Sequence, residues 1–214
     1  MRGGDTMDNI EYTQVDKDIL DFLKAVFFGS IECPIAAASH RAYRDLNRTI
    51  RFGGMPQEQR DGLRSKVTSR FKQEIPAMVE HGVHSQESYD EWHCQLCNEI
   101  RLLYRNSGVE FHIGQAQKWV NMTMKYLYIC GAYSFKGIFQ YLHIPIDNYV
   151  FTVAEKELHI PQPKVRWSRW NSYDKQYLAY QKELRSRICG LSPLRWEFKF
   201  WLQEARQVIQ NDLP

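Results

Sequence analysis

The chain has 214 residues, of which 43% are hydrophobic and 14% aromatic, and these proportions predict a folded globular protein with a substantial core. The net charge of +3 is too small to indicate a polyanionic partner by itself, and no apolar run approaches the roughly 20 residues that a membrane-spanning helix needs. Five cysteines, an odd number, and the lack of an apolar leader at the start indicate a reducing compartment, so we expect a cytoplasmic protein.

Helical periodicity recurs along the chain and no strand alternation is convincing, so the sequence predicts an all-α fold. We expect residues 1–12 to form a loosely ordered tail and residues 13–214 to form one two-lobed helical domain. Helices are predicted over residues 16–29, 33–52, 56–81, 85–107, 115–131, 148–158, 172–189 and 192–210.

The first two predicted helices differ in character. Residues 16–29 have apolar side chains at helical spacing and are expected to form a core helix. Residues 33–52 instead place a row of arginines where all four can share one face. The row comprises Arg41, Arg44, Arg48 and Arg51. A solvated surface and a DNA-backbone contact both explain such a row. His40 is better explained as a surface group than as a catalyst, because no acid–base partner is identifiable near it.

The next two predicted helices contain a proline and a set of metal-ligand residue types. Pro76 is expected to kink or end the helix over residues 56–81. The metal-ligand types are His81, His84, Cys94 and Cys97. Because the two cysteines fall one turn apart within the helix over residues 85–107, whereas structural zinc sites usually take such pairs from turns, we interpret them as buried thiols. We therefore expect no metal and no other cofactor.

Two short motifs further along carry residues with potential chemistry. The first, directly after a turn, reads Gly114-Gln115-Ala116-Gln117-Lys118. Unpaired backbone N–H groups at a helix start can hold a phosphate, and small residues let the anion come close. The second, Pro145-Ile146-Asp147, brings a carboxylate to the start of the helix over residues 148–158, where Asp147 is also a competent N-cap.

Together, these motifs resemble those of the helix-hairpin-helix superfamily of DNA glycosylases. In that superfamily a Gly-x-Gly-x-Lys hairpin precedes a helix, and a Pro-Val-Asp element follows. The first motif matches with Ala116 in place of the second glycine, and the second matches with Ile146 in place of valine. The long spacing between Lys118 and Asp147 is most similar to that of archaeal 8-oxoguanine DNA glycosylases.

The resemblance implies a helix-hairpin-helix region at residues 85–131 and a catalytic-aspartate loop and helix at residues 143–159. The residues implied to hold a DNA phosphate are Gly114, Gln115, Ala116 and Gln117. Asp147 would stabilise the oxocarbenium ion as a base leaves, and Lys118 would form a Schiff base that leads to AP-lyase activity. The expected partner is double-stranded DNA with a damaged or modified base, bound by a monomer.

A basic, tryptophan-rich loop over residues 161–170 follows. Its basic residues, candidates for DNA-backbone contacts, are Lys164, Arg166 and Arg169. Trp167 and Trp170 are candidates for stacking on an extruded base, although a lid over the core explains them equally well. The two terminal helices are expected to pack against the first.

Two other functions fit the same sequence. A non-catalytic helical nucleic-acid-binding or adaptor protein would use the hairpin and the arginine row for phosphates, with Asp147 serving only as a cap. A helical ribonuclease would use His40 together with the helix over residues 41–51. We take DNA base excision as the leading hypothesis.

Overall fold

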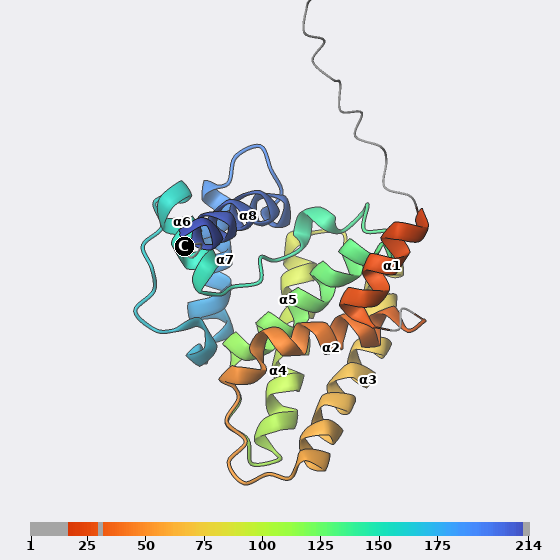
Figure 1. Cartoon of the computed structure of the whole chain (residues 1–214). Helices are drawn as coiled ribbons and strands as arrows, with labels where there is room; N and C mark the ends of the chain where they lie inside the picture. The colour runs from red at the N-terminus through yellow and green to blue at the C-terminus, as the bar shows by residue number, and fades with distance from the viewer. Residues whose placement is uncertain (1–16, 30–31, 212–214) are drawn as a thin grey trace, which may run out of the picture.

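The computed structural model describes residues 17–29 and 32–211, and the described chain is all-helical, as the sequence predicts (Figure 1). The helices are α1 (Lys17–Phe28), α2 (Pro34–Leu46), α3 (Gln57–His81), α4 (Gln86–Arg105), α5 (Ile113–Cys130), α6 (Asn148–Leu158), α7 (Ala179–Arg187) and α8 (Pro193–Asn211). Three 3₁₀ turns, η1 (Asn47–Thr49), η2 (Phe139–Tyr141) and η3 (Trp167–Arg169), and one π-helical turn, η4 (Tyr173–Leu178), lie between them. The predicted tail at residues 1–12 lies outside the described residues.

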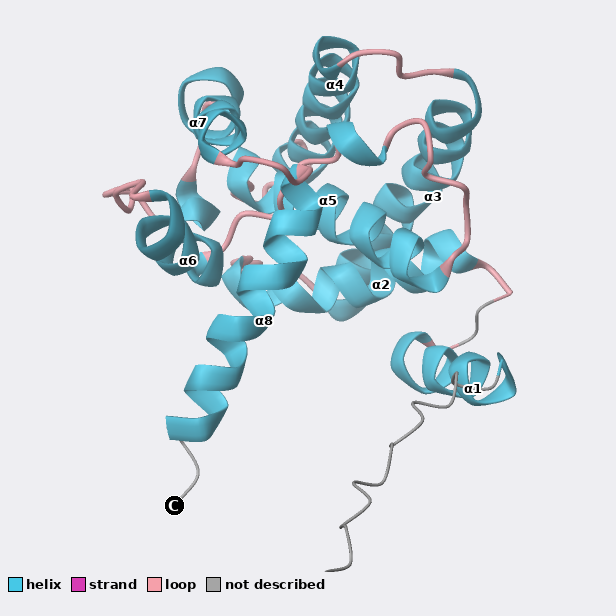
Figure 2. Cartoon of the chain, turned by 90° about the horizontal axis from the view of Figure 1, so that it is seen from above, coloured by secondary structure: helices cyan, strands magenta, loops and turns pink. Residues whose placement is uncertain are grey.

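Helix α5 forms the centre of the molecule. Every residue from Ile113 to Leu127 is buried, whereas a surface helix keeps one polar face in water. Helices α2 and α4 both pack on α5, and η3 and η4 contact it from the C-terminal half of the chain. In Figure 2, α5 lies between α4 and α2, and α6 and α7 lie on the side away from α3.

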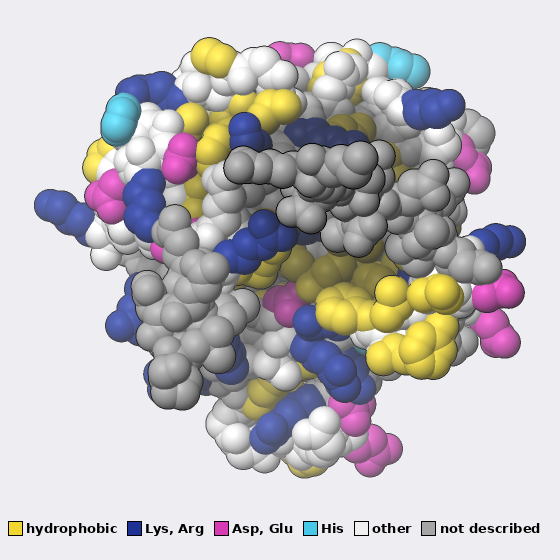
Figure 3. Space-filling view, turned by 45° about the horizontal axis from the view of Figure 1, so that its top comes forward, with side chains coloured by type: hydrophobic (Ala, Val, Ile, Leu, Met, Phe, Trp, Pro, Cys, Tyr) yellow, Lys and Arg dark blue, Asp and Glu magenta, His cyan; other side chains and the backbone are white. Residues whose placement is uncertain are grey.

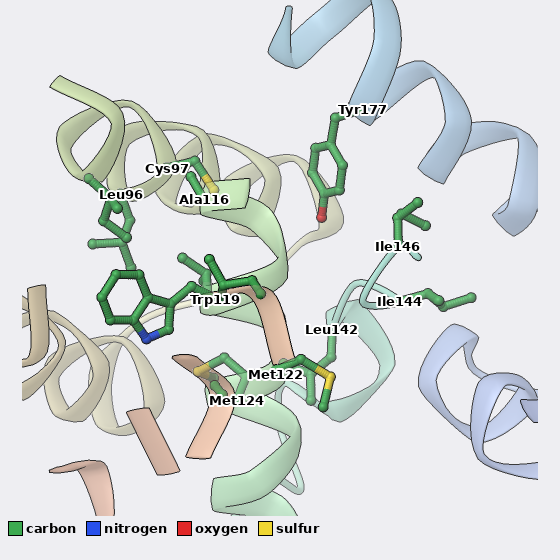
Figure 4. Packing of buried hydrophobic residues seen from close by; sticks show 14 of the residues in the cluster. Leu96, Cys97, Ala116, Trp119, Met122, Met124, Leu142, Ile144, Ile146 and Tyr177 are labelled. Carbon is green, nitrogen blue, oxygen red and sulfur yellow. The ribbon is translucent and has the colours of Figure 1, made fainter. Parts of the chain in front are cut away.

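Trp119 on α5 shows how distant segments are joined in the core (Figure 4). Its indole ring is fully buried and lies 4.9 Å from the ring of Tyr43 on α2 and 6.0 Å from that of Phe71 on α3, centroid to centroid. The indole N–H donates to the backbone oxygen of Ser39 at 3.0 Å. A buried aromatic ring with its polar atom bonded combines area burial with a fixed orientation.

Local chemistry explains several helix ends. The Ser85 hydroxyl accepts a hydrogen bond from the Ser88 N–H and so begins α4. Helix α5 ends at Gly131, whose φ of 66° lies in the left-handed region that favours glycine. Pro193 occupies the first position of α8, where a missing N–H is tolerated.

Some expectations for individual helices are wrong. The predicted helix over residues 33–52 stops at Leu46, so neither Arg48, which lies in η1, nor Arg51 is on it. Of the two effects expected of Pro76, a kink or an end of the helix, the end does not occur, because α3 continues to His81. Ile75 and Met78 on either side of the proline are buried, so packing of both segments holds the helix together.

Helix α1 is not a core helix. It has no buried residue, and the side chains of Ile19, Phe22 and Val26 are 56%, 65% and 68% exposed. Helix α8 packs mainly on α6 and η2, whereas α1 packs on α2, so the expected contact between the first and last helices is not a main feature of the fold. None of the described helices combines the length and the apolar character that crossing a membrane requires.

Candidate functional site

Lys118 and Asp147 meet in the folded chain, although 29 residues separate them. Lys118 lies in the second turn of α5 and donates from Nζ to Oδ2 of Asp147 at 2.7 Å. Asp147 precedes α6, and its Oδ1 accepts the N–H of Val150 at 2.9 Å, which confirms the predicted N-cap. The lysine side chain is 6% exposed and the aspartate 20%, so a buried ammonium is neutralised by a carboxylate that reaches the surface.

The pair lies in the wall of a cleft of about 1120 Å³. The cleft is bordered by α2, η1, α5, α8, the start of α6 and residues 166–168. Its basic lining residues are Arg41, Arg44, Arg48, Lys118, Lys125 and Arg166. Its aromatic lining residues are Phe27, Tyr126, Tyr149, Trp167, Phe198 and Trp201. Lysine and arginine side chains gather with apolar ones near the centre of the face in Figure 3. The cleft therefore offers positive charge and aromatic rings beside Asp147, the carboxylate of the ion pair.

Three of the four predicted arginines reach this cleft. Arg41 binds Asp45 at 2.8 Å and lies over the ring of Phe27, 4.6 Å from its centroid. Arg44 and Arg48 are exposed along the cleft, on α2 and on η1 respectively. Arg51 does not line the cleft, because the chain has left the helix there and pairs its backbone with that of Glu110.

Only part of the basic loop over residues 161–170 reaches the cleft. Arg166 and Trp167 line the cleft, whereas the exposed Lys164 does not. Arg169 is directed to Glu110, with Nη1 at 3.2 Å from the carboxylate. Trp170 is 2% exposed, and its indole N–H donates to a backbone oxygen at 3.1 Å, so it cannot stack on a base without leaving the core.

The structure contradicts the predicted phosphate-binding hairpin. Residues 114–117 lie inside α5, which begins at Ile113, and all four are buried. The N–H of Gly114 donates to the backbone oxygen of Trp170 at 3.0 Å. A Cβ atom on Gly114 would lie 1.7 Å from the backbone oxygen of Trp167. The glycine therefore allows η3 to pack on α5, and the helix start that was expected to hold phosphate is covered by protein.

A second ion pair in the cleft was not predicted. Lys125, two turns along α5 from Lys118, donates to both carboxylate oxygens of Glu197 at 2.7 Å. Burial raises the pKa of Glu197, and the positive charges of Lys125 and Lys118 oppose that shift. The sequence contains a signal for this residue, since Glu197 interrupts an apolar face of α8. That face is formed by Leu194, Phe198 and Trp201.

The remaining candidates lie elsewhere. His40 is largely exposed and does not line the cleft. Its partial burial, together with the charges of Arg64 and Lys72, lowers its pKa. Cys94 and Cys97 lie within α4, the latter fully buried, and His84 is exposed. Among the described residues, no group of three or more His, Cys, Asp or Glu is arranged to hold a metal ion.

No family model, curated protein or solved structure matches this chain. Any function therefore has to be inferred from the residues of the cleft themselves.

Proposed function

We propose that this protein is a DNA N-glycosylase that releases a damaged or modified base from double-stranded DNA. The observation that carries the proposal is the Lys118–Asp147 pair in the wall of a basic, aromatic-lined cleft. The arginines of α2 and η1, with Arg166, provide positive charge for the phosphates on both sides of an extruded nucleotide. Trp201 is partly exposed and offers a ring surface on which the base could stack, whereas Trp167 borders the cleft but is only 8% exposed.

Asp147 suits the bond-breaking step. Cleavage of the N-glycosidic bond leaves positive charge on the sugar carbon and ring oxygen, and a carboxylate fixed beside them stabilises that charge without having to move. The helix cap and the lysine fix both oxygens of Asp147. Because its side chain is partly exposed on the cleft, the carboxylate is accessible to a bound sugar.

Lys118 adds a covalent route. A neutral amine at Nζ could attack the sugar carbon, so that the base leaves with the bonding electron pair and takes up a proton. Opening of the sugar ring would then give a Schiff base, from which elimination cleaves the strand. The ammonium must first lose a proton. In this route the carboxylate of Asp147, within hydrogen-bonding distance, accepts that proton and passes it to the leaving base, so it does not at the same time provide the negative charge that stabilises the sugar cation.

A non-catalytic nucleic-acid-binding protein is the second candidate. It is favoured by the cap, since the bond from Val150 to Asp147 gives that aspartate a structural role without any reaction. No comparable observation favours a ribonuclease, because His40 lies outside the cleft and its nearby charges, Arg64 and Lys72, are both positive.

The test is borohydride trapping and base release on duplexes that carry single modified bases or abasic sites. We compare wild type with Lys118→Gln, Asp147→Asn and the control Lys156→Gln, which removes an exposed ion-paired lysine on α6 outside the cleft. A bifunctional glycosylase gives an adduct on abasic duplexes that disappears in Lys118→Gln, and base release from modified duplexes that fails in Asp147→Asn. Binding of DNA without release or adduct on a broad panel would support the binding protein instead.

A further inference from the structure

The segment that delivers Asp147 to the cleft is an extended, buried stretch of chain. Residues 142–146 form no helix or strand, and Ile144 and Ile146 are fully buried. Backbone N–H and C=O groups removed from water need partners, and this segment has no ladder or helix to supply them. Buried side-chain amides supply them instead.

Gln117 holds the peptide groups directly before Asp147. Its Nε2 donates to the backbone oxygen of Ile146 at 3.0 Å, and its Oε1 accepts the N–H of Ile146 at 3.2 Å. The second Nε2 hydrogen goes to the oxygen of Gly114 at 2.9 Å, and Oε1 also accepts from Asn121 at 3.0 Å. Gln117 has no exposed surface. All four hydrogen-bonding positions of the amide are used, so its orientation is fixed.

Neighbouring residues of α5 therefore hold neighbouring residues of the segment. Gln117 binds Ile146, and the next residue, Lys118, binds Asp147. The two contacts fix the carboxylate from two sides, through the backbone of the preceding residue, Ile146, and through its charge.

We propose that Gln117 is a positioning residue for Asp147, holding the Ile146 backbone so that the carboxylate meets both Lys118 and the cleft. The expected effect of Gln117 on catalysis rests on the proposed glycosylase function, whereas its expected effect on the position of Asp147 does not.

A buried network fixes Gln117 in turn. Asn121, which donates to Gln117, also donates to the hydroxyl of Tyr177 at 2.8 Å. That hydroxyl lies 2.7 Å from Nδ1 of His143, and Nε2 of the same ring lies 2.6 Å from Asp90. Since the carboxylate only accepts, Nε2 of His143 is the donor. Burial lowers the pKa of His143, which favours the neutral ring with Nδ1 accepting from Tyr177.

Gln181 on α7 provides a matched control. It too has no exposed surface, donates to the oxygen of Ile144 at 2.7 Å and accepts its N–H at 3.3 Å. The type of contact and the burial are the same, but the clamped residue lies farther from Asp147. Loss of either amide should weaken the fold, whereas only loss of the Gln117 amide should release the carboxylate.

The experiment compares Gln117→Met with Gln181→Met by amide hydrogen exchange at Val150, whose N–H is bonded to Asp147. We expect Val150 to exchange roughly fivefold to tenfold faster in Gln117→Met, the effect of losing a cap, and at the wild-type rate in Gln181→Met. Equal exchange in the two variants, or wild-type exchange in Gln117→Met, would overturn the proposal.

Gln117→Glu is a second variant in case the methionine variant does not fold. A protonated glutamic acid can still donate to Ile146, whereas a carboxylate cannot, so protection of Val150 relative to wild type should fall as the pH is raised. A ratio independent of pH would contradict the assigned role.

Base release is then measured in parallel with exchange. We expect release roughly a hundredfold slower in Gln117→Met, with DNA affinity unchanged. If wild type releases no base from any duplex, the proposed function fails, but the exchange at Val150 still decides the role of Gln117.

Discussion

Replacing Asp147 by asparagine would separate the two roles of this residue in the fold. Asparagine caps helices as well as aspartate does, so the bond to Val150 is kept. The charge opposite Lys118 is lost, which leaves an ammonium in a side chain that is only 6% exposed. Asp147→Asn therefore probes the ion pair, and Asp147→Ala probes the pair and the cap together.

The expected size of the effect follows from the burial of each partner. Breaking a fully buried pair costs about 3–5 kcal/mol, and losing a hydrogen bond to a charged group costs about 1.5–3 kcal/mol. Because Asp147 is 20% exposed, water can reach the ammonium, and we expect Asp147→Asn to lower the free energy of unfolding by about 2 kcal/mol. Asp147→Ala should lose about 1 kcal/mol more, the contribution of a cap.

Urea unfolding followed by far-UV circular dichroism measures these changes in Asp147→Asn, Lys118→Met and the double variant. The double variant should be about 1–2 kcal/mol more stable than the sum of the single losses predicts, because removal of both charges leaves neither one buried alone. Losses that add to within about 0.5 kcal/mol would show that the two groups do not interact in solution, and would refute the pair.

Three further predictions concern packing, DNA binding and pH. Gly114→Ala should destabilise the fold by about 3 kcal/mol because a backbone oxygen must move, whereas Gly62→Ala, whose Cβ meets open space within α3, should stabilise it by about 0.5–1 kcal/mol. Thermal unfolding of both variants checks the contrast, and equal melting temperatures would contradict it. Arg44→Gln on the cleft should reduce the salt dependence of DNA binding by about one unit of slope and Arg51→Gln should not, as titrations at several salt concentrations would show; equal slopes would count against the cleft as the binding surface. Burial acts to raise the pKa of Asp90, but hydrogen bonds from neighbouring side chains lower it to about 2 from an ordinary 3.8. The ionised Asp90 therefore stabilises the fold above pH 3.8, and this contribution of about 2 kcal/mol is lost as the pH falls toward 2. Unfolding measured as a function of pH should show this loss in wild type and not in Asp90→Asn.

Much of the local structure could be predicted from the sequence. The caps at Ser85 and Asp147 and the proline at the start of α8 each depend on atoms within a few residues, so local sequence is sufficient to identify them. The all-α fold follows from periodicity for the same reason. Pro76 shows the limit, because long-range packing keeps α3 helical through a residue that would break it in isolation.

The residues of the cleft could be predicted only in part. The arginine row is indicated by residue type and spacing, whereas Asp147 is indicated by its place at a helix start and by the resemblance to the glycosylase motif. Trp170 has the same sequence signal as Trp167, a tryptophan among basic residues. Both rings are buried, 2% and 8% exposed respectively, but only Trp167 borders the cleft. Glu197 was assigned to a structural helix, since nothing near it in sequence indicates the distant lysine that it binds.

The sequence by itself determined the helices, their caps and the residue types available for chemistry, because these depend on contacts within a turn or two of chain. The tertiary structure decided which of those residues meet. It brought Lys118 to Asp147, covered Gly114 with η3 and left the apolar face of α1 exposed. Periodicity shows that a helix has an apolar face, but only the packing of side chains distant in sequence determines what covers that face.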